Sequence, residues 1–221
     1  MREFFIIILS RLVATRMRVI SFSFGSLVCH DNIVVMIIVR RFNQEVIARV
    51  RKGKVGIIPT DTIYGIVGVA NSPEAVAKIY RIRKRDSKKP MIILISKISD
   101  LKLFGIKLTE EIRKILDGLW PGKVSIILKS TSKKFKYLDR GKKTLAFRLP
   151  DNKTLRSFIS KTGPLVAPSA NPEGLEPAIN IQEAKRYFGD KVDFYVDKGS
   201  LKSKPSKLVA IRDHEVILIR K

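Results

Sequence analysis

Short apolar runs alternate with longer amphipathic stretches from residue 36 onward. The apolar runs predict strands at 55–58, 91–95, 124–128, 144–149, 165–167, 194–196, 208–211 and 216–219. The amphipathic stretches predict helices at 43–52, 73–84, 109–118, 153–161 and 181–188. Ser72 before Pro73, and likewise Thr109 and Asn180, have the features of helix N-caps. This alternation predicts one α/β domain with a mixed sheet, formed by residues 36–221.

The first 35 residues have a different pattern. The apolar run at 4–9 is too short to span a bilayer, and Arg11, Arg16 and Arg18 follow it. A weak signal peptide, a membrane anchor and a translation start at Met36 are all open interpretations. We treat residues 1–35 as an N-terminal extension and expect no stable membrane insertion. The single cysteine, Cys29, fits a reducing, cytoplasmic location.

The charge balance is strongly basic. The chain has 44 Lys and Arg against 20 acids, a net charge of +24. Such an excess favours polyanionic partners, namely nucleic acid, nucleotides or an anionic membrane. A Lys-rich solvated surface is the alternative, although such surfaces usually match Lys with Glu. With one cysteine and only His30 and His214, a zinc site is disfavoured, and we expect no protein-held metal.

The segment 59–65, Pro-Thr-Asp-Thr-Ile-Tyr-Gly, ends an apolar strand on a cluster of hydroxyl groups. Thr60, Thr62 and Tyr64 are thereby held at the edge of a sheet, where ligands of α/β proteins commonly bind. An ordinary turn is the alternative, because Pro and Asp are turn residues.

A basic segment follows the predicted helix at 73–84. Six cations fall within residues 81–90: Arg81, Arg83, Lys84, Arg85, Lys88 and Lys89. One or two would complement the helix dipole. Six favour a polyphosphate clamp, in which Arg makes bidentate contacts and Lys supplies a point charge.

Two further positions carry candidate chemistry. Pro168 and Pro172 hold Ser169 and Asn171 in a rigid display suited to hydrogen-bonding a phosphate or ribose. Arg148 lies in an otherwise apolar strand, so it must find an anion or face solvent. The sequence has neither a Walker A loop nor a Gly-x-Gly-x-x-Gly motif, which disfavours P-loop NTPases and Rossmann dehydrogenases.

Taken in this order, the motifs resemble the YrdC/Sua5 family of L-threonylcarbamoyladenylate synthases over roughly residues 40–220. The similar segments are Pro59-Thr-Asp-Thr-Ile-Tyr-Gly65, residues 83–90, Trp120-Pro-Gly122, Ala146-Phe-Arg-Leu-Pro150 and Pro168-Ser-Ala-Asn171. The resemblance implies a YrdC-like fold: a twisted open mixed sheet with flanking helices and a deep basic groove.

The resemblance also implies a reaction. L-threonine, bicarbonate and ATP would give L-threonylcarbamoyladenylate and diphosphate, for the t6A modification of adenosine 37 in tRNA. The enzyme class would be nucleotidyltransferase, with Mg²⁺ accompanying the ATP. Proteins of the t6A pathway and tRNA are implied partners.

Residue roles follow from the resemblance in the same way. The residues implied to bind threonine are Thr62, Arg148, Ala167 and Ser206. Those implied to bind ATP are Arg85, Lys89, Thr144, Ser169 and Arg220. The supporting residues are Thr60, Tyr64, Arg83 and Asn171. No residue is implied to act as a covalent catalyst, since attack on a phosphate needs positioning and charge neutralisation.

Four positions depart from the family pattern. Arg83 stands where the family has Lys, Leu94 and Pro177 replace polar residues, and Lys207 replaces the Thr of a Ser-Thr pair. These departures leave an alternative open. The chain would then be a YrdC-like paralogue that binds tRNA or double-stranded RNA without synthase activity.

Overall fold

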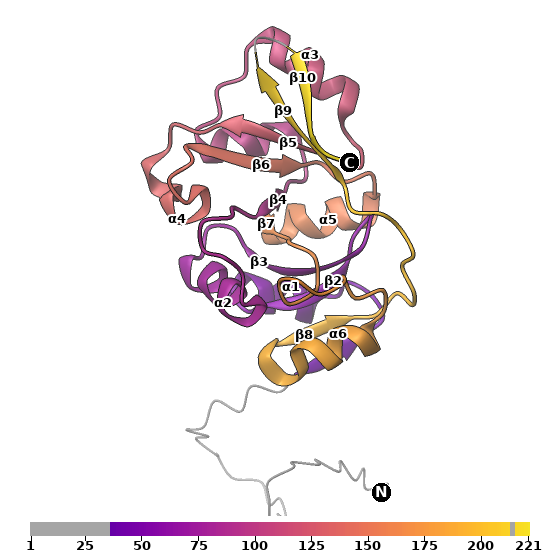
Figure 1. Cartoon of the computed structure of the whole chain (residues 1–221). Helices are drawn as coiled ribbons and strands as arrows, with labels where there is room; N and C mark the ends of the chain where they lie inside the picture. The colour runs from indigo at the N-terminus through magenta and orange to yellow at the C-terminus, as the bar shows by residue number, and fades with distance from the viewer. Residues whose placement is uncertain (1–35, 213–214) are drawn as a thin grey trace, which may run out of the picture. The chain divides into compact units, whose positions relative to one another are not determined.

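A computed structural model describes residues 36–212 and 215–221 of this chain (Figure 1). The expected N-terminal extension, residues 1–35, lies outside the described residues. Among the helices that the structure describes, none is long and apolar enough to cross a membrane.

The described strands form one mixed sheet in the order β1-β8-β2-β3-β7-β4-β6-β5-β9-β10. Their bounds are β1 (Ile37–Val39), β2 (Gly56–Pro59), β3 (Tyr64–Val69), β4 (Ile92–Leu94), β5 (Val124–Lys129), β6 (Thr144–Arg148), β7 (Leu165–Val166), β8 (Phe194–Val196), β9 (Lys207–Arg212) and β10 (Glu215–Arg220). Strand β8 pairs in parallel with β1 and β2, and the pairs β4–β6 and β5–β9 are also parallel. The other pairs are antiparallel. The predicted open mixed sheet is therefore confirmed.

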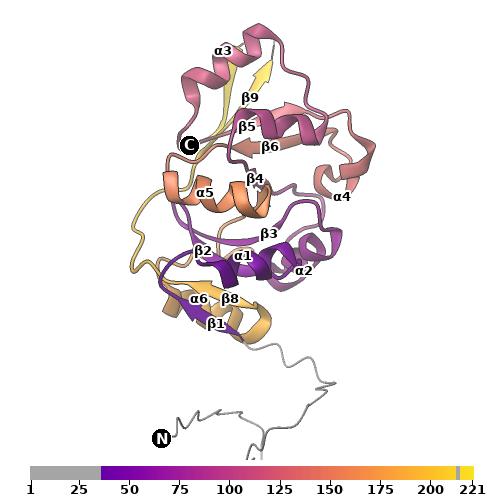
Figure 2. The same ribbon diagram turned by 180° about the vertical axis from the view of Figure 1, so that it is seen from behind.

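Helices cover both faces of this sheet. Their bounds are α1 (Gln44–Arg51), α2 (Pro73–Arg83), α3 (Glu110–Leu119), α4 (Lys136–Asp139), α5 (Lys153–Thr162) and α6 (Ile181–Phe188), with 3₁₀ turns η1 (Ile98–Phe104), η2 (Lys133–Phe135) and η3 (Gly189–Lys191). Side chains alternate along β2, so Ile57 and Ile58 enter different cores. Ile58 packs with α1 and α5, which lie together in Figure 2. Ile57 belongs to the core on the other side, which also contains side chains of α2, α3, α4 and α6.

The predicted helix starts are also confirmed. The Ser72 side chain accepts a hydrogen bond from the Ala75 N–H at 3.1 Å, and Asn180 accepts one from Glu183 at 2.9 Å. Thr109 caps α3 in the same way, through the Ile112 N–H. Each cap satisfies a backbone donor that has no partner within the helix.

Strand β3 was not expected from the sequence. Residues 60–63 form a turn, and the chain returns antiparallel to β2 as β3. This strand contains Gly65 and Gly68, which have low strand propensity. A Cβ on Gly68 would lie 3.1 Å from the Ala75 Cβ, so this glycine lets α2 approach the sheet closely. Tertiary packing here overrides local preference.

Candidate functional site

The turn between β2 and β3 is organised by the Thr60 hydroxyl. This group donates to the Ile63 carbonyl at 2.7 Å and accepts from the Thr62 and Ile63 N–H groups. Its oxygen also lies 3.0 Å from the Thr62 hydroxyl. Both threonines are buried. The turn therefore presents a fixed pair of hydroxyl groups.

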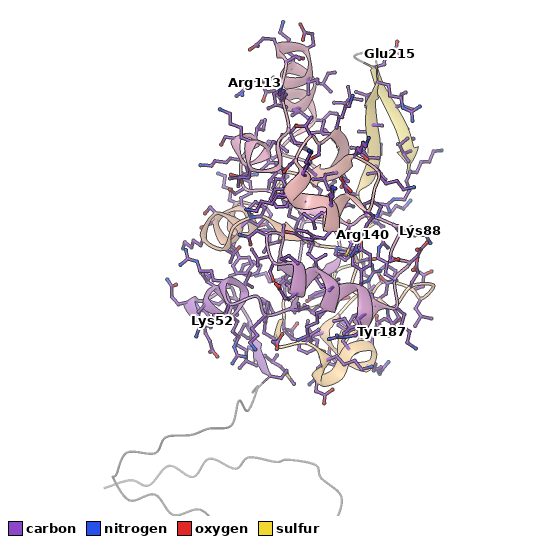
Figure 3. All side chains as sticks on the ribbon, turned by 90° about the vertical axis from the view of Figure 1, so that its left-hand side faces the viewer. Lys52, Lys88, Arg113, Arg140, Tyr187 and Glu215 are labelled. Carbon is purple, nitrogen blue, oxygen red and sulfur yellow. The ribbon has the colours of Figure 1, made fainter. Side chains whose placement is uncertain are left out.

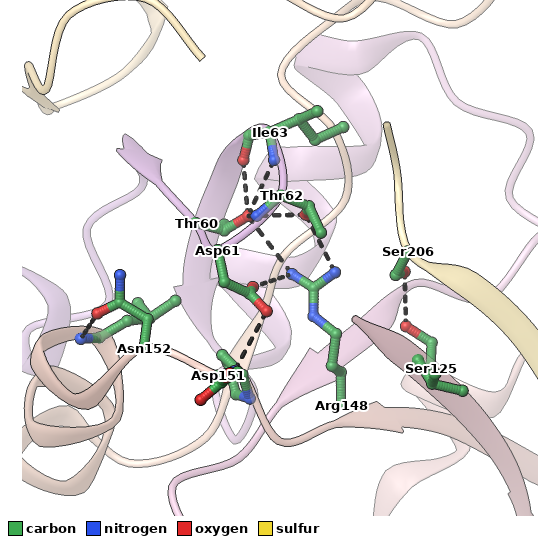
Figure 4. Close-up of polar contacts among 12 residues, drawn as sticks. Thr60, Asp61, Thr62, Ile63, Ser125, Arg148, Asp151, Asn152 and Ser206 are labelled. Atoms are coloured by element: carbon green, nitrogen blue, oxygen red, sulfur yellow. Dashed lines mark hydrogen bonds and ion pairs between the residues drawn. The ribbon is translucent and has the colours of Figure 1, made fainter. Parts of the chain in front are cut away.

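Arg148, at the end of β6, reaches this turn from the neighbouring part of the sheet (Figure 4). Its guanidinium donates to Thr62 Oγ1 at 3.1 Å and to Thr60 Oγ1 at 3.4 Å. Arg148 Nη2 also lies 3.1 Å from Asp61 Oδ1, and both side chains are at most 5% exposed. Burial lowers the pKa of Arg148, and nearby Arg220 acts in the same direction, whereas the Asp61 carboxylate opposes the shift. The anion that Arg148 requires is thus Asp61, and the pair fixes the guanidinium in one orientation.

Arg83, the last residue of α2, connects that helix to the loop after β7. It is 2% exposed. Its guanidinium donates to the Asn171 carbonyl at 2.7 Å, to Asn171 Oδ1 at 3.2 Å and to the Ser169 hydroxyl at 3.3 Å. Burial, reinforced by Arg85, lowers the pKa of Arg83 to about 10. The guanidinium fork of Arg83 thus holds both polar residues of the loop, Ser169 and Asn171.

The loop of Ser169 is also joined to β3. The Ile66 N–H donates to the Pro168 carbonyl, and the Ala170 N–H donates to the Tyr64 carbonyl. Gly65 and Ser169 face each other as an isolated antiparallel bridge. A Cβ on Gly65 would lie 3.4 Å from the Pro168 carbonyl oxygen, an ordinary van der Waals distance. Ser169 is therefore held by β3 on one side and by Arg83 on the other.

The C-terminal strands complete the site. The Ser206 hydroxyl, 2% exposed, lies 2.9 Å from the Ser125 hydroxyl of β5. Arg220, at the end of β10, donates to the Ser206 carbonyl at 3.0 Å. The contact ties β10 to the segment that precedes β9.

One pocket of about 480 Å³ collects these groups. This volume suits a small-molecule ligand. Eleven of the thirteen expected site residues line it: Thr60, Thr62, Tyr64, Arg83, Arg85, Thr144, Arg148, Ala167, Ser169, Ser206 and Arg220. Five lining residues are cations, and none of the described lining residues is acidic. The pocket is therefore suited to an anionic ligand.

Two expected residues do not line this pocket. Lys89 forms an ion pair with Glu173 at 2.7 Å, and its carbonyl accepts from Arg85. Asn171 turns its amide away to donate to the Pro172 and Leu175 carbonyls. The expected contact between Lys89 and ATP stays a prediction that requires the Glu173 ion pair to open.

Three residues near the pocket were given no role from the sequence. They are Asp61, Ser125 and Lys142, of which Lys142 lines the pocket directly. The role of Asp61 could have been predicted, because Arg148 in its apolar strand needs an anion. Asp61 is an acid that lies between two expected site threonines. Lys142 had none, since it is one of several lysines in a loop whose course depends on the positive φ of Arg140 and Lys143.

Tyr64 lines the pocket while its hydroxyl points to the segment after β8. The hydroxyl donates to the Gly199 carbonyl at 2.7 Å and accepts from the Lys198 N–H at 2.9 Å. Burial raises the pKa of this phenol, so it stays neutral at physiological pH. Tyr64 therefore supports the wall of the pocket as a neutral side chain.

An open mixed sheet around a pocket of cations and hydroxyls defines an α/β protein that binds an anionic small molecule. Residues 48–221 match the family model Sua5_yciO_yrdC, whose description is "Telomere recombination". The chain belongs to this family.

Relatives and solved structures agree with that assignment. The chain is 35% identical over 170 residues to a Methanocaldococcus jannaschii protein, covering 76% of this chain and 79% of that one. It is 31% identical over 176 residues to the threonylcarbamoyl-AMP synthase of Marinobacter nauticus, covering 77% and 92%. Its fold matches the Pyrococcus abyssi Sua5 structure complexed with L-threonine, with a TM-score of 0.75 and 25% identity. That match covers 84% of this chain and 57% of the longer Pyrococcus protein.

Proposed function

We propose that this protein is a threonylcarbamoyl-AMP synthase. It would join L-threonine, bicarbonate and ATP, giving L-threonylcarbamoyladenylate, diphosphate and water. The observation that carries the proposal is the pocket itself, which combines five cations with the buried hydroxyls of Thr60 and Thr62. The relative from Marinobacter nauticus bears the name of this activity.

The chemistry needs positioning and charge neutralisation more than a nucleophile on the protein. The threonine amine and bicarbonate form a carbamate, whose oxygen attacks the α-phosphorus of ATP. The bond from that phosphorus to the bridging oxygen breaks, and diphosphate leaves with the electron pair. Transfer of the adenylyl group makes the protein a nucleotidyltransferase. Negative charge accumulates on phosphate oxygens throughout, and fixed cations in a water-poor pocket stabilise it.

We assign the two ends of the pocket to the two larger substrates. Thr62, Arg148, Ala167 and Ser206 would hold threonine, and Arg148 would meet its carboxylate. Asp61 and the two threonine hydroxyls keep the Arg148 guanidinium in place before the substrate arrives. Such preorganisation avoids the cost of ordering a long side chain during binding.

The ATP end would consist of Arg85, Thr144, Ser169 and Arg220, with Lys89 recruited from Glu173 and Lys142 added from its loop. Asn171 and Arg83 would hold the Ser169 loop. The described residues contain no group of three or more His, Cys, Asp or Glu side chains able to hold a metal ion. Any Mg²⁺ would therefore be bound by the triphosphate and water rather than by a protein cage.

The decisive experiment measures diphosphate release with ATP, threonine and bicarbonate present, and with each omitted in turn. We expect release only in the complete mixture, together with threonylcarbamoyl-AMP detected by mass spectrometry. Absence of release from a protein that still binds ATP would refute the synthase proposal.

The net charge of +24 favours RNA binding as a second candidate function. RNA binding is expected in two cases. In the first, the chain is a paralogue without synthase activity. In the second, it is a synthase that also docks on tRNA, where it could contact proteins of the t6A pathway. Diphosphate release separates the first case from the second.

A further inference from the structure

Strand β10 lies at the end of the sheet order and pairs only with β9 among the described strands. Its sequence from 215 to 220 is Glu-Val-Ile-Leu-Ile-Arg. The four central side chains are 37–49% exposed. Because neighbouring residues point to opposite sides of a strand, both faces of β10 present apolar groups to solvent.

This edge lacks the usual protection of edge strands. Natural edges are short, carry inward-pointing charges or Pro, or are covered by another element. The opposite edge of the sheet follows this rule, since β1 has three residues. Strand β10 has six residues, with a register shift between Leu218 and Arg220 close to its end. Its central backbone donors and acceptors on the outer side face no other described strand.

We infer that β10 is the interface through which two copies of this chain associate, with the two strands antiparallel. The strand ends indicate a second copy as the occupant. Glu215 starts the strand, whereas Arg220 ends it and Lys221 follows. An antiparallel pair places the acid of each copy against the basic end of the other, while a parallel pair aligns like charges. Two-fold symmetry also requires the antiparallel arrangement, because one patch must complement itself.

Strand β10 is the last in the strand order, so its outer side faces no other described strand. Figure 3 shows Glu215 at the outer tip of the β9–β10 ribbon. Pairing would extend one sheet across both copies and bury the apolar side chains on each face. It would also fix the strand that carries Arg220, which lines the pocket.

The association has a definite salt dependence. Two copies that each carry +24 repel each other, and salt screens this repulsion. Salt also weakens the ion pairs of the two Glu215 side chains, but these are few against the net charge of each copy. Backbone hydrogen bonds and apolar contacts are little affected by salt. The dimer should therefore become tighter as ionic strength rises.

The test is the mass of the full-length protein in solution, measured by analytical ultracentrifugation over a wide range of concentration and salt. We expect a shift from 25.1 kDa towards twice that value, favoured by salt. Leu218→Lys should remove the shift, because it places a charge in the centre of the paired strand. Ile38→Lys is the matched control, since Ile38 is 48% exposed on the opposite edge strand, and it should dimerise like the unmodified chain.

A second variant guards against misfolding of the first. Glu215→Lys should weaken the dimer by opposing the basic ends, and adding Lys221→Glu should recover part of it. Circular dichroism checks that each variant is folded. A chain that stays monomeric at every concentration and salt, or that loses its dimer with Ile38→Lys but keeps it with Leu218→Lys, would overturn the inference. The assay contains no ATP, so its failure would leave the synthase proposal untouched.

Discussion

Among single residues, Asp61 has the largest expected effect on stability, because it neutralises a buried cation. Its side chain is 3% exposed and that of Arg148 5%. Asp61→Ala would leave the guanidinium in the interior without a counter-ion. We expect the free energy of unfolding, measured by urea denaturation, to fall by about 3–5 kcal/mol.

Asp151→Ala is the matched control for this prediction. The Asp151 side chain is 73% exposed and lies 3.9 Å from Arg156. Its loss should cost no more than about 1 kcal/mol, since exposed ion pairs contribute little. Similar losses for the two variants would contradict the assignment of Asp61 as the buried counter-ion.

Lys142 allows the proposed ATP end of the pocket to be tested at one side chain. It lines the pocket, whereas its exposed neighbour Lys143 does not. Lys142→Ala should weaken ATP binding about tenfold, the loss expected for one charged contact to a phosphate. Lys143→Ala removes the same charge from the same loop and should leave the affinity, measured by calorimetry, unchanged. Equal weakening by both would show a general electrostatic effect instead of a contact.

At the scale of elements, the pairing of β2 with β8 depends on a glycine. A Cβ on Gly56 would lie 2.3–2.4 Å from ring atoms of Phe194, which is fully buried. Gly56→Ala should therefore lower the free energy of unfolding by about 1–3 kcal/mol through overpacking.

A glycine-to-alanine substitution in α3 should have the opposite effect on the free energy of unfolding. Gly118 lies inside this helix, and apart from its chain neighbours and the helix's own backbone, a Cβ added to it would meet no described atom within 4 Å. Gly118→Ala should raise stability by up to about 1 kcal/mol, because alanine is the better helix former. Chemical denaturation of the two variants measures the change in the free energy of unfolding for each. Destabilisation by Gly118→Ala would count against this account of α3.

Elements with strong local signals could be predicted from the sequence, and those made by packing could not. The helix predicted at 181–188 has those bounds in the structure, because Asn180 caps its first turn and Gly189 follows its end. Strands β1 and β3 and the short helix α4 were missed. In β3 the glycines conceal the strand, and the stability of that strand comes from β2, β7 and α2.

The candidate site was predictable to a similar degree. The motifs identified which side chains gather in the pocket, since most of them lie at or next to an end of a strand or helix. They did not identify the pairing between these side chains. Arg148 was expected to pair with the carboxylate of the substrate. In the structure it already forms an ion pair with Asp61. Lys89 was expected at the phosphates, but it reaches Glu173 instead. Partner choice depends on distances across the fold, which motif spacing does not contain.

At the scale of the whole molecule, the charge far exceeds what the pocket can use. Five cations line the pocket, whereas the chain has 44 Lys and Arg. Most of the positive field therefore lies outside it, where a large polyanion can reach. We expect the protein to bind tRNA with an affinity that falls steeply as salt is raised, because each phosphate contact releases counter-ions.

The same charge distribution predicts how ATP and RNA interact on the protein. An ATP molecule bound within the pocket leaves the cations outside it free, so saturating ATP should displace little bound tRNA. Fluorescence anisotropy of labelled tRNA, titrated at several salt concentrations with and without ATP, measures both effects. Displacement of tRNA by ATP would place the RNA in the pocket and favour the RNA-binding paralogue over the synthase. An affinity for tRNA that does not change with salt would show that the net charge of +24 does not drive tRNA binding. If tRNA stays bound in the presence of ATP, the result would instead fit a synthase that binds tRNA on its surface, outside the pocket. That tRNA would be the RNA modified with the product of the synthase.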